Sequence, residues 1–219
     1  VQPRMVKIFG AGGIRKLHAY SSGFLVSAEG HIATIWSHVL DSDEVTVVLD
    51  SGRRLRATVL GAEPQLDLAI LKREADGLEL PHFDLSKAAD ATPGMRVLGF
   101  SNMFKVAAGD EATSVLHGIV AARTKLTTRR GAFETPYRGD VYVVDAITNN
   151  SGAGGGMLTT RDGRLLGMIG RELRNSRSNP GVNYAIPNSE LKCVIREIIR
   201  GQYISCEKQH PATHTPRRN

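Results

Sequence analysis

Only two cysteines, Cys193 and Cys206, occur in the 219 residues of this chain. Two thiols do not make the disulfide framework of a small secreted domain, and they do not identify the redox compartment. No apolar run reaches the length of about 18 residues that a membrane-spanning helix needs, so no membrane span is expected. Aromatic residues are scarce, at 5%. Because the net charge of +6 comes without an aromatic platform or a clustered basic stripe, no nucleic-acid partner is expected.

Signatures of metals and cofactors are missing as well. His18, His31, His82 and His117 show no ligand spacing with cysteines or carboxylates, and neither a phosphate-binding loop nor a dinucleotide fingerprint occurs. We therefore expect no cofactor and no metal. The chain does have a hydrophobic content of 41%, which is enough for a core. Its length fits one large all-β domain or two small barrels that share a cleft.

Short β-rich segments recur along the chain, separated by clusters of Gly, Asp, Asn and Pro. The segments 45–49 and 55–59 flank Asp50-Ser51-Gly52, which is the pattern of a β-hairpin. Further strands are expected at 68–71, 96–100, 113–120, 141–144, 165–169 and 184–186. This rhythm indicates a sandwich or antiparallel barrels rather than alternating strands and helices.

One helix is expected near the C-terminus, where apolar residues repeat at helical spacing. These residues are Leu191, Val194, Ile195, Ile198 and Ile199. Asn188 or Ser189 is expected to cap the helix, and Gly201 to end it. We divide the chain into an N-terminal extension (1–19), a first barrel (20–110), a second barrel with the helix (111–204) and a flexible polar tail (205–219).

Five short motifs follow one another along the chain: YSSGFLV at 20–26, TIWSHVL at 34–40, LDLAILK at 66–72, GIVAA at 118–122 and NYAIP at 183–187. In order and spacing they resemble the motifs G-S-G-F-I-I, L-T-N-x-H-V-V, D-L-A-V-L-K, G-I-V-S-A and G-F-A-I-P of the HtrA/Deg family of trypsin-like serine proteases. The resemblance runs from about residue 20 to about residue 200. It implies a double six-stranded antiparallel β-barrel, as in trypsin, with a C-terminal helix.

The resemblance also implies roles for two side chains. His38 occupies the position of the general base, and Asp67 the position of the carboxylate that orients the base. Ile35 and Trp36 stand beside His38 where the family has polar residues. Acyl transfer further needs a nucleophilic side chain and backbone N–H groups that bind the developing oxyanion.

The segment expected to supply the nucleophile departs from the family pattern. DAITNNSGAGGGML at 145–158 resembles D-A-x-I-N-x-G-N-S-G-G-x-L. Aligned on Leu158, the serine position is Gly154; aligned on Asp145, it is Ala153. Neither side chain can attack a carbonyl. The backbone of Gly152, Ala153 and Gly154 can still present N–H groups to an oxyanion, because glycines permit unusual φ values and close approach.

Two functions follow from these residues. The first is a pseudo-protease that binds extended peptide or unfolded protein segments in the cleft, since loss of the nucleophile costs on the order of a million-fold in turnover. The alternative is an active or deliberately inactivated serine endopeptidase. Ser151 would then be a displaced nucleophile, or Ala153 would mark a Ser→Ala change. The resemblance further implies a role in protein quality control, the bacterial cell envelope or periplasm, and a homotrimer.

Overall fold

The structure is a computed structural model, and it describes residues 1–10, 19–41, 44–74, 77–125, 129–130, 133–134, 139–170 and 182–201. The predicted tail at 205–219 lies outside the described residues. So does residue range 11–18 of the predicted N-terminal extension.

The first barrel contains six antiparallel strands. They are β1 (Met5–Phe9), β2 (Tyr20–Leu25), β3 (His31–Ile35), β4 (Val45–Val48), β5 (Arg54–Glu63) and β6 (Leu68–Arg73). The strands close in the order β1-β2-β3-β6-β5-β4. The predicted hairpin is β4–β5, in which Val48 pairs with Arg54. Gly52 in its turn has a φ of 78°, a value that favours glycine.

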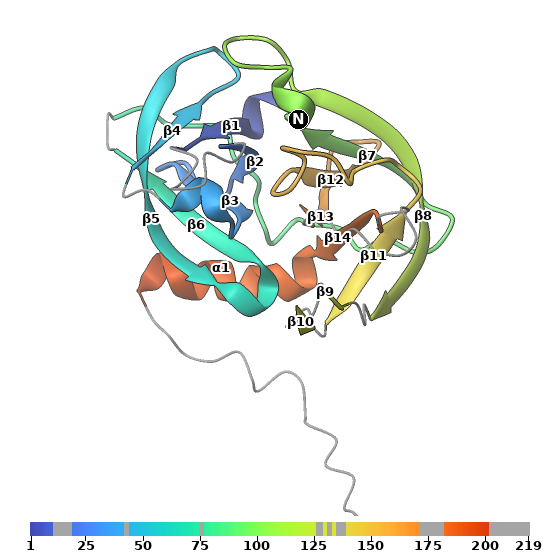
Figure 1. Cartoon of the computed structure of the whole chain (residues 1–219). Coiled ribbons are helices and arrows are strands. Elements are labelled where there is room, and N and C mark those ends of the chain that lie inside the picture. Colours follow the sequence, from blue (N-terminus) through green and yellow to red (C-terminus); the bar gives the residue numbers. More distant parts are fainter. Residues whose placement is uncertain are drawn as a thin grey trace, which may run out of the picture.

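The second barrel also contains six antiparallel strands. They are β7 (Arg96–Ser101), β8 (Ser114–Lys125), β11 (Asp140–Val144), β12 (Met157–Thr160), β13 (Leu165–Ile169) and β14 (Tyr184–Pro187). They close in the order β11-β14-β13-β12-β7-β8, and β9 (Arg129–Arg130) and β10 (Phe133–Glu134) form a separate pair. Figure 1 shows the two barrels side by side. The predicted fold class, a double six-stranded barrel, is confirmed.

The boundaries of the barrels differ from the predicted division in two places. β1 lies within the predicted N-terminal extension, yet it closes the first barrel between β2 and β4. β7 precedes residue 110, yet it belongs to the second barrel. The residues Met5, Val6, Lys7 and Ile8 of β1 are all buried, so this strand lacks the alternation that marks a half-buried strand. Barrel closure depends on pairing between distant segments, which local patterns do not reveal.

The C-terminal helix α1 (Asn188–Arg200) packs against β5 and β6 of the first barrel and β13 and β14 of the second. Its apolar stripe is as predicted, with Leu191, Ile195 and Ile198 buried. Gly201 ends the helix in the left-handed conformation at φ 68°, also as predicted. The predicted cap is wrong: Pro187 precedes the helix without a side-chain cap, and Asn188 instead donates its Nδ2 to the Leu85 carbonyl at 3.1 Å.

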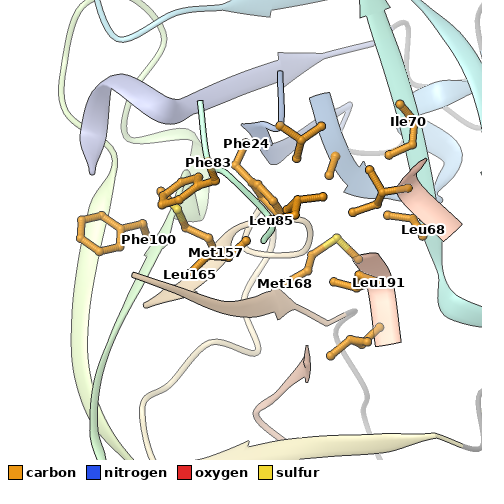
Figure 2. Packing of buried hydrophobic residues seen from close by; sticks show 14 of the residues in the cluster. Phe24, Leu68, Ile70, Phe83, Leu85, Phe100, Met157, Leu165, Met168 and Leu191 are labelled. Carbon is orange, nitrogen blue, oxygen red and sulfur yellow. The ribbon is translucent and has the colours of Figure 1, made fainter. Parts of the chain in front are cut away.

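A single hydrophobic cluster joins the two barrels and the helix (Figure 2). The first barrel contributes Phe24, Leu68 and Ile70, while α1 contributes Leu191. The second barrel contributes Phe100, Met157, Leu165 and Met168, and the connecting segment contributes Phe83 and Leu85. Because one shared core contacts all three units, the barrels are held in a fixed relation and the segments at their junction are positioned by both.

A buried lysine ties the second barrel to the first. Lys7, on β1, is only 1% exposed, and its Nζ donates to the carbonyls of Gly109 and Glu111 at 2.6 and 2.9 Å. Burial lowers the pKa of Lys7 from 10.5, and neighbouring carboxylates, Asp50 first among them, offset part of this effect. The loop 102–113 between β7 and β8 is therefore anchored on the first barrel.

We expect Lys7→Met to lower the free energy of unfolding by about 2 kcal/mol, because two carbonyls lose a charged donor. Urea denaturation measures the loss. Since the folded chain binds the Lys7 proton more weakly than the unfolded chain, this residue's contribution to stability rises with pH up to about 10.5, and the difference from the variant should widen over that range. Lys72→Met is the control, because Lys72 is only half-buried and also donates to a carbonyl, that of Glu29. Equal effects of the two changes would contradict the anchoring role.

Candidate active site

The backbones of His38 and Asp67 lie at the same end of one strand pair. Ile35, the last residue of β3, pairs with Leu68, the first residue of β6. One residue further, the Trp36 N–H donates to the Asp67 carbonyl at 2.7 Å. Asp67 itself adopts the left-handed conformation at φ 50°, and His38 begins the short 3-10 helix η2 (His38–Leu40). The His38 side chain lies outside the described part of the structure, so its predicted contact with Asp67 stays a prediction.

Two consecutive tight turns form the segment 150–156. The Ala153 N–H donates to the Asn150 carbonyl at 3.0 Å, and the Gly156 N–H donates to the Ala153 carbonyl at 3.0 Å. Gly152 and Gly155, the third residues of these turns, both have a φ of 82°. Each turn therefore has the type II pattern, whose third position favours glycine. We call this segment the double turn.

The double turn packs directly on the end of β3. A Cβ on Gly155 would overlap the Ser22 carbonyl oxygen and would lie 2.6 Å from Thr34 Oγ1. A Cβ on Gly154 would lie 3.0 Å from Cδ1 of Ile35 and would have ordinary contact with the Gly170 carbonyl. The structure thus brings the backbones of all three predicted site segments together around Ile35, the residue between Thr34 and Trp36.

Four backbone N–H groups of the double turn have no acceptor among the described residues: those of Asn150, Ser151, Gly152 and Gly154. Gly152 and Gly154 belong to the oxyanion set that is expected from the sequence. The carbonyl of each of their peptide units is held: the Ser151 carbonyl accepts from the Phe104 N–H at 2.9 Å, and the Ala153 carbonyl accepts from Gly156. Because a peptide unit is planar, a fixed carbonyl also fixes the direction of the N–H at its other end. The Ala153 N–H, which belongs to the expected oxyanion set, is instead engaged with Asn150.

Ser22, on β2, holds the double turn on the first barrel. Its N–H donates to the Gly154 carbonyl at 3.2 Å, and its hydroxyl donates to the Gly152 carbonyl at 2.7 Å. The hydroxyl also accepts from the Asn102 N–H at 2.7 Å. Ser22 and Asn102 are both 0% exposed. The motif that contains Ser22 was identified from the sequence, but its positioning role was not, since its partners lie far away along the chain.

The loop 102–107 is closed by the Asn102 side chain, which donates to the Ala107 carbonyl and accepts from the Ala107 N–H at 2.9 and 3.0 Å. Phe104 and Lys105 within it have positive φ values of 53° and 58°. Such backbone is unfavourable for residues other than glycine and is often kept at functional sites. Phe104 is 62% exposed, and Ile147, on the neighbouring segment, is 67% exposed. No sequence pattern pointed to either residue.

Within the described ranges, no group of three or more His, Cys, Asp and Glu residues is arranged to bind a metal ion. None of the helices there is long and apolar enough to cross a membrane.

Comparisons with known proteins agree with the geometry. A model described as "Trypsin-like peptidase domain" matches residues 21–168. The chain is 32% identical over 182 residues to a probable periplasmic serine endoprotease DegP-like of Brucella suis, covering 83% of this chain and 33% of the relative. It is 31% identical over 179 residues to a protein of the same description from Halomonas elongata, covering 80% of this chain and 34% of the relative. The chain thus spans about a third of the length of these curated relatives.

Solved structures show the same fold. The MamO protease domain from Magnetospirillum magneticum superposes with a TM-score of 0.71 at 24% identity, covering 89% of this chain and 96% of that one. A structure of the HtrA-type protease AlgW with a tripeptide gives a TM-score of 0.73 at 26% identity, covering 92% of this chain and 62% of that one. The family model covers more than half of the sequence. The chain therefore belongs to the trypsin-like peptidase domain family, and it is a homologue of HtrA/DegP-like proteases.

Proposed function

We propose that this chain is a catalytically silent HtrA/Deg-like protein that binds extended or unfolded polypeptide at the junction of its two barrels without cleaving it. His38 and Asp67 would remain from the ancestral catalytic site, and Gly154 would stand at the position of the lost serine. One observation carries the proposal: the double turn keeps N–H donors in fixed directions, while residues 152–156 include neither a hydroxyl nor a thiol.

Burial supports Gly154 rather than Ala153 as the lost nucleophile position. Ala153 is 0% exposed, so a serine hydroxyl there would be enclosed by protein. The Cβ direction of Gly154 instead points at Ile35, three residues before His38 along the chain. Ser151 is a poor replacement, because it lies three positions before Gly154 in the double turn and productive contact with a base requires about 2.6–3.2 Å.

The surroundings of the double turn support a polypeptide ligand. An extended chain carries carbonyl groups, which accept from backbone N–H donors, and apolar side chains, which pack on exposed apolar residues. Phe104 and Ile147 supply such residues, and their segments are joined where Asn150 Nδ2 donates to the Ile147 carbonyl and contacts Met103 Sδ. Relatives described as DegP-like serine endoproteases act on proteins, and their description as periplasmic supports the same compartment for this chain.

We expect Phe104→Asn to weaken the binding of unfolded casein about threefold to tenfold, because it removes the exposed ring. Asparagine tolerates the left-handed conformation, and the change keeps the N–H that holds the Ser151 carbonyl, so stability should be equal or slightly higher. Fluorescence anisotropy of labelled casein measures affinity, and mass spectrometry checks that casein stays intact.

Leu60→Asn is the matched control for this experiment. Leu60 is 42% exposed and lies on β5, whose strand partners are β4 and β6. If casein does not bind the wild-type protein, or if both changes weaken binding equally, the proposed surface is wrong.

A further inference from the structure

The absence of a nucleophile changes which ligand the free N–H groups of Gly152 and Gly154 can hold. In an active protease, attack by the serine converts a neutral carbonyl oxygen into an oxyanion, and the backbone donors stabilise the developing charge. No side chain at Gly152, Ala153 or Gly154 can form that covalent bond. A ligand oxygen with a full negative charge must therefore carry the charge before it binds.

The C-terminal carboxylate meets this requirement in every polypeptide, whatever its sequence. We propose that the N–H groups of Gly152 and Gly154 bind such a carboxylate, so that the chain captures polypeptide ends in preference to internal segments. This inference rests on the proposed function and names the ligand class of the same site. Hydrogen bonds to an ionised acceptor are roughly twice as strong as those between neutral groups, which gives the free terminus its advantage.

Contacts already described prepare the donors for an anion. The Gly152 N–H direction is set by the Phe104 bond to Ser151, and the Gly154 N–H direction by the turn bond to Gly156. Ser22 holds the following carbonyls of both glycines, so neither peptide unit needs to reorganise when a ligand arrives. Backbone N–H groups gathered in a turn of this kind form anion-binding sites in other proteins.

A cation on the loop 102–107 adds to the preference for a C-terminal carboxylate. Lys105 follows Phe104, and its Nζ lies 5.6 Å from the centre of the Phe9 ring. Phe9 pairs with Tyr20, and a Cβ on Gly152 would overlap the Tyr20 ring. The ammonium group is thus held on the side of the first barrel that faces the double turn, where it favours a negative ligand and makes binding sensitive to salt.

The test uses peptides with a fluorescein label at the N-terminus and an apolar last residue, each made as the free acid and as the C-terminal amide. We expect the free acid to bind the wild-type chain at least tenfold more tightly, and the difference to shrink at high salt. Amide forms that bind as tightly as free acids would overturn the inference. If casein binds while the two peptide forms do not differ, only this inference fails; if casein does not bind either, the proposed function fails.

A pair of variants isolates one donor. Gly154 is the second residue of a type II turn, where φ is near the value that proline imposes. Gly154→Pro and Gly154→Ala both add a Cβ towards Ile35, but only proline removes the N–H. We expect Gly154→Ala to keep the preference for free acids and Gly154→Pro to reduce it to less than about threefold. Full preference in a folded Gly154→Pro protein would contradict the assignment.

Amide chemical shifts give a readout that needs no variant. In the wild-type chain, titration with the free acid should move the Gly152 and Gly154 N–H resonances downfield, and titration with the amide should move them less. Unchanged resonances at saturation with the free acid would place the carboxylate elsewhere and overturn the inference.

Discussion

Gly155→Ala should lower the free energy of unfolding by about 4 kcal/mol, which is at the upper end for single substitutions. Two costs combine at this position. The φ of 82° is unfavourable for alanine. The added Cβ would also overlap the Ser22 carbonyl and crowd the Ile35 N–H at 2.8 Å, so β2, β3 or the double turn must move.

Gly94→Ala is the matched control for this change. Gly94 has a φ of 88° and donates its N–H to the Val120 carbonyl, but a Cβ there would meet nothing within 4 Å. Gly94→Ala should lower the free energy of unfolding by about 1 kcal/mol, which is the cost of the left-handed backbone alone. Urea denaturation of both variants separates the two costs. Similar losses in the two proteins would mean that the double turn is not pressed against β3.

Restoring a hydroxyl at Gly154 should not by itself restore chemistry. The Cβ of Gly154→Ser would lie 3.0 Å from Ile35 Cδ1, which is tighter than nearly all real contacts, so the serine or Ile35 must shift. A misplacement of about 1 Å costs on the order of a hundred-fold in rate. We expect Gly154→Ser to react with a fluorophosphonate at background rate. Ala153→Ser should do the same, because that position is fully buried.

Removing the crowding should reveal the difference. Ile35→Thr shortens the side chain and supplies the polar residue type that the family has beside its histidine. Combined with Gly154→Ser, it should raise fluorophosphonate labelling at least tenfold over Gly154→Ser alone, and His38→Ala should abolish the gain. Ile35→Thr alone is the control and should not label. Rapid His38-dependent labelling of the single Gly154→Ser protein would contradict this reasoning and indicate a recently or deliberately silenced enzyme.

Turn residues and periodicity predicted hairpin β4–β5, strands β7, β8, β11, β13 and β14 of the second barrel, and helix α1, but not β12. The double barrel itself was expected from the family resemblance. β1 was not predicted either, because Lys7 interrupts its apolar run although the side chain is buried. Its ammonium finds partners at Gly109 and Glu111, and a pairing over such a sequence separation leaves no local trace. The helix cap failed for a similar reason, since Asn188 is used to bond distant Leu85.

The motifs predicted which segments form the candidate site, but not the hydrogen bonds within it. The motifs placed His38, Asp67 and the double turn in one expected site, and the backbone geometry brings their segments together. Which N–H groups are free could not be read from the sequence. That property depends on Ser22 and Asn102, whose hydrogen bonds join segments 80 to 130 residues apart, and on the strained backbone of Phe104.

If the chain binds polypeptide at the junction of its barrels without hydrolysing it, casein should stay intact. Cleavage is measured as the release of fluorescence from heavily labelled, self-quenched casein at neutral pH, with the wild-type chain, with His38→Ala and with buffer alone. We expect the same background rate in all three, because no hydroxyl or thiol stands at Gly154 or Ala153. Release by the wild-type chain above buffer that disappears in His38→Ala would contradict this expectation and show that a serine elsewhere, Ser151 first among them, serves as the nucleophile.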